Sequence, residues 1–132
     1  MRILRSLKSR RTLFGFTVLS LGLDDLAGLD DLDAVIVPIG GGGLISGVAF
    51  AIKSLRPDVK VYGVQAAGAA SMFNSVKNGK IETLKGVSTF ADGIAVKQPG
   101  DNTFELCSKY VDEIVTVSED EISSAILALI EQ

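Results

Sequence analysis

The chain has 132 residues, of which 47% are hydrophobic and 22% are charged, and its formal net charge is -3. This composition is typical of one folded globular domain and excludes a disordered chain. The small negative charge gives no electrostatic reason to expect nucleic acid or an acidic membrane surface as a partner. The sequence contains no histidine, so the most common general base and metal ligand of proteins is missing.

The single cysteine, Cys107, cannot form a disulfide within the chain, and the cysteine content does not indicate an oxidising compartment. It falls in a predicted helix over residues 102–110, where a thiol is typically buried in the core. No histidine is available to activate it as a nucleophile. We therefore expect a structural cysteine in a cytoplasmic protein.

The N-terminal part of the chain differs in character from the rest. Basic residues precede the apolar stretch Leu13–Leu23, which is the outline of a secretory signal peptide. The acidic pair Asp24-Asp25 follows instead of a small-residue cleavage site, and the stretch is too short to span a bilayer. We favour an ordinary helix, or a segment foreign to the domain, over a signal peptide. Residues 1–32 are thus predicted to be a separate segment of uncertain status, and residues 33–132 the domain.

A regular pattern begins with the apolar run Ala34–Ile39, which predicts a strand buried on both faces, as in a parallel sheet. Apolar residues then recur at helical spacing and predict a helix over residues 43–55, which must end before Pro57. Residues 59–64 form the next predicted strand. This order of strand, helix and strand predicts a right-handed β-α-β unit.

The second half of the chain continues the alternation. We expect a helix over residues 69–77 ending at Asn78-Gly79, irregular residues 80–91, a short strand at Gly93–Val96, a helix over residues 102–110 and a strand at Glu113–Val117. Ser118 and Glu121 form a capping box for a last helix. The apolar face of that helix comprises Ile122, Ala125, Ile126, Leu129 and Ile130. Alternating strands and helices predict an α/β fold.

Four consecutive glycines, Gly40–Gly43, separate the first strand from its helix. A glycine in regular structure costs about 0.5–1 kcal/mol relative to alanine, so such a run needs a reason. Without side chains the loop can turn its N–H groups toward one point, and the helix N-terminus adds free N–H groups and a positive dipole end. We predict an anion site here. The alternative is a tight turn without a ligand.

The surrounding residues restrict the kind of phosphate ligand. Gly42 and Gly47 match the glycines of a nucleoside-triphosphate loop, but Val48-Ala49 occupy the places of its lysine and hydroxyl residue. A dinucleotide fingerprint is approached by Gly41, Gly43 and Ser46, yet Gln65 stands where an acidic ribose ligand is expected. A phosphate monoester held by the backbone fits better than either nucleotide.

At this point the sequence resembles a known family. The run DAVIVPIGGGGLISGVAFAIK (Asp33–Lys53) is similar to the phosphate-binding segment of fold-type II pyridoxal-phosphate enzymes of the threonine ammonia-lyase and serine racemase branch. The similarity continues through VKVYGVQ, FADGIAV, PGDNTFEL and YVDEIVTVSEDEI. It implies a parallel-sheet, three-layer (Rossmann-like) part of that family's large domain.

The resemblance also implies site residues. The residues expected to supply N–H groups to the phosphate of pyridoxal 5'-phosphate are Gly40, Gly41, Gly42, Gly43 and Leu44, and Asp92 and Gly93 are expected beside the cofactor ring. Racemase-like relatives carry a divalent-cation site built on two acidic residues, at places where this chain has Gln65 and Ser71. We therefore expect no metal site.

The family's Schiff-base lysine, in a Ser-Phe-Lys-x-Arg segment, has no counterpart in this sequence. Ser6–Arg10 offers Lys8 in a loose match, but the distance to Gly40 is far too short for the small domain that separates the two segments in the family. We assign no catalytic residue. The resemblance thus implies a fragment of a threonine ammonia-lyase (threonine to 2-oxobutanoate plus ammonia, as in isoleucine biosynthesis) that is inactive alone.

Three alternatives stay open: a fragment similar to serine dehydratase or serine racemase, a non-catalytic phosphate-binding α/β module, and half of a nucleotide-dependent oxidoreductase. A sheet without its complementary strands would present an unpaired edge and an uncovered helix face. We therefore expect a homo-oligomer or other self-association, an amino-acid substrate (threonine or serine) in the intact enzyme, and neither nucleic acid nor membrane as a partner.

Overall fold

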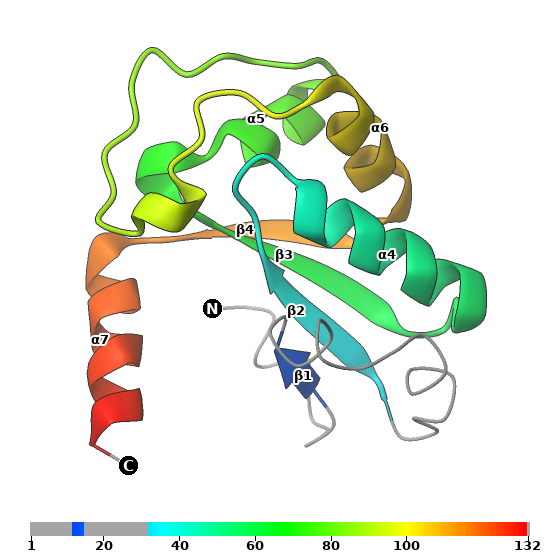
Figure 1. Ribbon diagram of the computed structural model, residues 1–132, viewed down its shortest axis with the longest axis horizontal. Helices are drawn as coiled ribbons and strands as arrows, with labels where there is room; N and C mark the ends of the chain where they lie inside the picture. The colour runs from blue at the N-terminus through cyan, green and yellow to red at the C-terminus, as the bar shows by residue number, and fades with distance from the viewer. Residues whose placement is uncertain (1–11, 15–31, 132) are drawn as a thin grey trace.

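The computed structural model of the chain describes residues 12–14 and 32–131. These residues form parallel strands and helices in alternation (Figure 1). The elements are β1 (Thr12–Phe14), β2 (Ala34–Pro38), α4 (Gly43–Leu55), β3 (Lys60–Ala66), η1 (Ala67–Ala69), α5 (Ser71–Asn78), η2 (Asp92–Ile94), α6 (Asp101–Tyr110), β4 (Glu113–Val117) and α7 (Glu119–Ile130). The predicted α/β fold with a parallel sheet is confirmed.

The sheet has the order β1-β2-β3-β4, with every neighbouring pair parallel. Ala34 pairs with Lys60 and Tyr62 pairs with Glu113, so the carboxyl ends of β2, β3 and β4 lie along one edge. In β2, Val35 and Val37 are completely buried on one face; on the other face Ala34 is buried, whereas Ile36 and Pro38 are half-buried. The edge at the carboxyl ends is where α/β folds place their ligands.

Helices α4 and α6 lie side by side over one face of the sheet (Figure 1). The apolar stripe of α4 meets the sheet through Ile45, Ala49 and Ile52, all buried. Gly63 in β3 faces Ile39 and Ile45, and a Cβ at this position would overlap their side chains. Its hydrogen side chain therefore lets α4 approach the sheet closely.

Most predicted element boundaries agree with the structure to within two residues. The second strand runs from Lys60 to Ala66, and the predicted helix over residues 69–77 is split into η1 and α5. That helix ends as predicted at Gly79, which has a φ of 69°. The capping box is also confirmed: the Glu121 N–H donates to Ser118 Oγ at 3.2 Å, and the Ser118 N–H donates to Glu121 Oε2 at 2.8 Å.

Two predictions about local structure are wrong. The strand expected at Gly93–Val96 is replaced by the turn η2, because Ile94 N donates to Ala91 O and Ala95 N to Asp92 O rather than to a neighbouring strand. The stretch Leu13–Leu23 is expected to be an ordinary helix or a segment foreign to the domain, but its first residues, Leu13 and Phe14, belong to β1 and pair with Val35 and Ile36 of β2. The rest of that stretch, together with Lys8, lies outside the described residues.

The last helix, α7, extends from the end of β4 away from α4 and α6 (Figure 1). Its predicted apolar face is largely exposed: Ile126 is 45% exposed, and Leu129 and Ile130 are each 73% exposed. Among the described helices, none combines the length and hydrophobicity needed to cross a bilayer.

Candidate functional site

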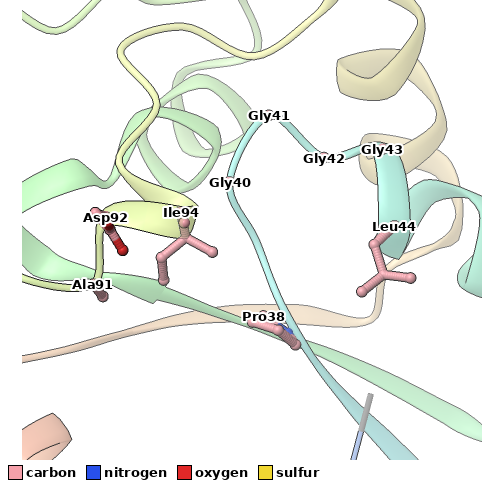
Figure 2. A pocket seen from close by; sticks show the side chains of 10 residues that line it. Pro38, Gly40, Gly41, Gly42, Gly43, Leu44, Ala91, Asp92 and Ile94 are labelled. Atoms are coloured by element: carbon pink, nitrogen blue, oxygen red, sulfur yellow. The ribbon is translucent and has the colours of Figure 1, made fainter. Parts of the chain in front are cut away.

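A pocket of about 520 Å³ opens where β2 ends. Two segments that are far apart in the sequence line it together with Pro38: the loop and helix start at Gly40–Leu44, and the turn at Ala91–Ile94. In Figure 2 the glycine loop crosses between Leu44 on one side and Asp92 and Ile94 on the other. The structure thus brings all of the predicted cofactor-binding residues into one pocket.

Gly42 is required by the backbone of the loop. It is the N-cap of α4 and has a φ of 94°, a left-handed conformation that residues with side chains rarely adopt. A Cβ at Gly42 would lie 2.5 Å from Met72 Cε and 3.0 Å from Thr103 Cβ. Both the φ angle and the close approach of α5 and α6 therefore demand glycine at this position.

Gly41 and Gly43 have different surroundings from Gly42. No atom of the described chain would lie within 4 Å of a Cβ at Gly43, and a Cβ at Gly41 would meet Val96 Cγ1 at an ordinary 3.8 Å. Packing therefore does not require glycine at these two positions. Both residues line the pocket, so the missing side chains leave room for a ligand to reach the backbone. This open space fits a phosphate group held by main-chain atoms.

The carbonyl groups of the loop are all engaged within the protein. Gly40 O accepts from Gln65 Nε2 at 3.4 Å, and Gly41 O accepts from Thr103 Oγ1 at 2.7 Å. At the start of the helix, Gly42 O accepts from Ser46 N at 3.0 Å and Gly43 O from Ser46 Oγ at 3.0 Å. No acceptor among the described residues pairs with the N–H groups of residues 41–44. The loop therefore has free donors and satisfied acceptors, as an anion site needs.

The charge distribution also favours backbone recognition. The described residues that line the pocket include neither lysine nor arginine, and Asp92 is their only ionisable side chain. An anion at the loop would be held by N–H groups and by the positive end of the α4 dipole. The described residues contain no cluster of acidic and cysteine side chains that could hold a metal ion.

Gln65 and Thr103 are site residues that the sequence did not reveal as such. Gln65 is fully buried; besides donating to Gly40 O, its Oε1 accepts from Phe73 N at 2.9 Å, which connects the glycine loop to α5. In the sequence, Gln65 was notable only because a dinucleotide site or a cation site would have an acidic side chain at its position. A polar residue at the end of an apolar strand, and a hydroxyl in the first turn of α6, are the only sequence features that point to these roles.

Two further buried side chains, Ser71 and Cys107, lie outside the pocket lining. Ser71 is fully buried, and its hydroxyl has no hydrogen-bond partner among the described residues. Cys107 is 1% exposed on α6, and burial raises the pKa of its thiol to about 11. Cys107 is part of the hydrophobic core, so its predicted burial is confirmed.

Comparisons with known proteins agree with the geometry. A family model described as "Pyridoxal-phosphate dependent enzyme" matches residues 12–132. The L-threonine ammonia-lyase of Thermotoga maritima is 57% identical over 113 residues, which are 86% of this chain and 28% of that protein. The processed form of threonine deaminase isoform 2 from Solanum lycopersicum superposes with a TM-score of 0.76 at 42% identity, covering 83% of this chain and 34% of that one. Maize serine racemase superposes with a TM-score of 0.75 at 36% identity, covering 86% and 34%.

The family model matches a longer part of the chain than the resemblance in the sequence, which begins at Asp33. The chain spans about a third of the length of the relatives that it matches. The family model begins at Thr12, upstream of Asp33, and the domain boundary at residue 33 stays a prediction. The match covers most of the chain and includes both segments of the pocket. The chain therefore belongs to the family of pyridoxal-phosphate-dependent enzymes.

Proposed function

We propose that this chain supplies the phosphate-binding part of the cofactor site of a threonine ammonia-lyase, which converts threonine to 2-oxobutanoate and ammonia. The observation that carries the proposal is the glycine loop, whose carbonyls are bound inside the protein while the N–H groups of residues 41–44, beside a pocket, have no acceptor within the described part of the chain. The similarity to the Thermotoga maritima L-threonine ammonia-lyase supports the choice of reaction. A serine dehydratase or racemase is the second candidate, supported by the superposition on maize serine racemase.

Pyridoxal phosphate, when bound, supplies an electron sink that makes the α-proton of an amino acid removable. The residues of this chain bind and orient that group. The N–H groups of Gly41, Gly42 and Gly43, with that of Leu44, would hold the phosphate at the positive end of α4. The apolar side chains of Pro38, Leu44 and Ile94 line the rest of the pocket. They would restrict water around the cofactor ring.

The described lining of the pocket offers binding groups but no obvious proton-transfer group. It contains no amine that could bond covalently to the cofactor, and Asp92 is an exposed carboxylate. We therefore propose that the chain by itself binds the cofactor without deaminating threonine. In this view no residue between Gly40 and Ile94 is catalytic, and the binding residues are Gly40–Gly43, Leu44, Asp92 and Gly93.

Binding and inactivity are tested on the full chain. Pyridoxine 5'-phosphate lacks the aldehyde and cannot bond covalently to surface lysines, so calorimetric titration with this compound measures the pocket alone. We expect it to bind, inorganic phosphate to compete, and pyridoxine without phosphate to bind at least about tenfold more weakly, which corresponds to roughly 1.4 kcal/mol. Equal binding of pyridoxine and its phosphate would contradict the phosphate site. Formation of 2-oxobutanoate from threonine faster than with free pyridoxal phosphate would contradict the predicted inactivity.

The remaining parts of the proposal concern partners. We infer a threonine or serine substrate for the intact enzyme, a cytoplasmic location, and no role for nucleic acid. Exposed apolar residues on α7 support self-association of the chain, since Leu127, Leu129 and Ile130 are each more than half exposed.

A further inference from the structure

Two loop carbonyls are bound by side chains from elements outside the loop. Gln65 at the end of β3 donates to Gly40 O, and Thr103 in the first turn of α6 donates to Gly41 O. Gly100 N approaches Gly41 O as well, at 3.5 Å. Neither Gln65 nor Thr103 lines the pocket. Both therefore act on the loop from the side away from the ligand.

The Thr103 hydroxyl has one proton and two acceptors within reach, Gly41 O at 2.7 Å and Gly100 O at 3.0 Å. The contact with Gly41 is the shorter one. Thr103 Cβ also packs against the position where Gly42 would carry a side chain. Thr103 thus holds the middle of the glycine loop through a hydrogen bond, and its Cβ leaves no room for a side chain at Gly42.

Because of peptide geometry, these two hydrogen bonds also fix the directions in which the N–H groups of the loop point. In a trans peptide the carbonyl of one residue and the N–H of the next point in opposite directions, and the described chain has no cis peptide bond. With Gly40 O directed to Gln65, the N–H of Gly41 is directed to the opposite side of the loop. With Gly41 O directed to Thr103, the same holds for the N–H of Gly42.

Such control is needed because glycine peptides rotate easily. A run of four glycines has few steric barriers in φ and ψ, so an unrestrained loop would also populate states with a carbonyl toward the pocket. In those states an acceptor replaces a donor, and the loop would repel a phosphate instead of binding it. Ordering the loop on binding would also cost conformational free energy.

We propose that Thr103 and Gln65 are positioning residues for anion binding: by fixing the Gly40–Gly41 and Gly41–Gly42 peptides, they keep the loop N–H groups aimed at the phosphate before it arrives. This inference rests on the proposed function of the loop as a phosphate site. Neither residue touches the ligand, and their effect passes through the backbone.

The test compares Thr103→Val, which keeps the shape and removes the hydroxyl, with Thr103→Ser, which keeps the hydroxyl. We expect Thr103→Val to weaken pyridoxine 5'-phosphate binding by about 3- to 10-fold, the range expected for one hydrogen bond, and Thr103→Ser to stay within about 2-fold of the unmodified chain. Ser108→Ala is the control for loss of a hydroxyl, because Ser108 is exposed in the last turn of the same helix and does not line the pocket. It should leave binding unchanged. Gln65→Met should weaken binding in the same direction as Thr103→Val.

A second readout separates failure of this inference from failure of the phosphate site. In the ligand-free chain, Thr103→Val should shift or broaden the amide resonances of Gly41 and Gly42, while that of Gly79 stays fixed. Unchanged loop amides together with unchanged affinity in Thr103→Val would overturn the positioning role. If the unmodified chain does not bind pyridoxine 5'-phosphate at all, the proposed function fails, and the ligand-free amide resonances alone decide whether Thr103 orders the loop.

Discussion

At the scale of single residues, neighbouring glycines of the loop have different reasons for being glycine. Gly42 combines a φ of 94° with a packing position that leaves no room for a Cβ between Met72 and Thr103. Gly43 begins α4 and has open space around it in the described chain. Folding therefore requires glycine at position 42. At position 43, glycine serves the proposed approach of a phosphate to the backbone.

We predict opposite outcomes for alanine at these two positions. Gly42→Ala should lower the free energy of unfolding by about 1–3 kcal/mol, because the left-handed conformation and the contact with Met72 both oppose a side chain. Gly43→Ala should leave that free energy within about 1 kcal/mol, since alanine suits the first turn of a helix. Urea unfolding measures both variants.

The same pair also tests the ligand. Gly43→Ala should weaken pyridoxine 5'-phosphate binding although the protein remains folded, because its methyl group enters the pocket. Loss of stability in Gly43→Ala, or undiminished binding, would show that Gly43 does not serve ligand approach.

The sequence predicted some of these residues and not others, for a physical reason. The pocket residues Gly40–Leu44 and Asp92-Gly93 lie in contiguous motifs, and the structure brings the two motifs together. Gln65 and Thr103 act through side-chain hydrogen bonds to backbone carbonyls that are 25 and 62 positions away in the chain. Such contacts depend on how α4, α6 and β3 pack, which residue spacing does not encode.

At the scale of elements, Asp112 connects α4, β3 and the link between α6 and β4, at the end of the sheet opposite the pocket. Its carboxylate accepts from Lys53 Nζ of α4 at 2.7 Å and from Val61 N of β3 at 2.7 Å, and it stands in the link between α6 and β4. Lys60 Nζ lies 3.5 Å from the same carboxylate. Burial alone would raise the pKa of Asp112, but the hydrogen bonds from Lys53 and Val61 and the two lysine charges outweigh it and hold the pKa below its usual value.

This cluster predicts a pH dependence of stability. Because the folded-state pKa of Asp112 is lowered, its contribution is complete above the unfolded-state pKa of about 3.9 and is lost as the pH falls through the folded-state value. Asp112→Asn should therefore lower the free energy of unfolding by about 1–2 kcal/mol at pH 7, with a difference from the unmodified chain that shrinks in acid. Urea unfolding at pH 7 and pH 3.5 measures it.

The matched control is Asp58→Asn. Among the described residues Asp58 pairs with Arg56, and its side chain is 67% exposed, so its loss should change stability little. Equal effects of the two substitutions, or a constant effect of Asp112→Asn across the pH range, would contradict the connecting role of Asp112.

Most of the helices and strands were predicted correctly from the sequence. The strand β2 is a continuous apolar run, and helix α4 has apolar residues at helical spacing. An apolar run marks β4, and a capping box marks the start of α7. The error at Gly93–Val96 arose because the short apolar run resembles a strand, whereas its backbone bonds close locally as η2. Periodicity over four residues does not separate these outcomes.

At the scale of the whole molecule, the described sheet ends at β4, and α7 leaves it with an exposed apolar face. The sequence indicated the apolar face correctly, and helical periodicity alone could not show whether another surface covers it. Large exposed apolar patches typically mark a contact surface.

We therefore predict that the chain self-associates through α7. Leu129→Glu places a charge in the exposed apolar face, whereas Ser124→Glu places the same charge on the other side of the helix, given 3.6 residues per turn. Because burying a leucine contributes about 1.5–3 kcal/mol, Leu129→Glu should weaken association at least about tenfold, and Ser124→Glu should weaken it much less. Sedimentation equilibrium over a range of protein concentrations measures both. An unmodified chain that stays monomeric at high concentration, or equal effects of the two substitutions, would show that the α7 face does not drive assembly.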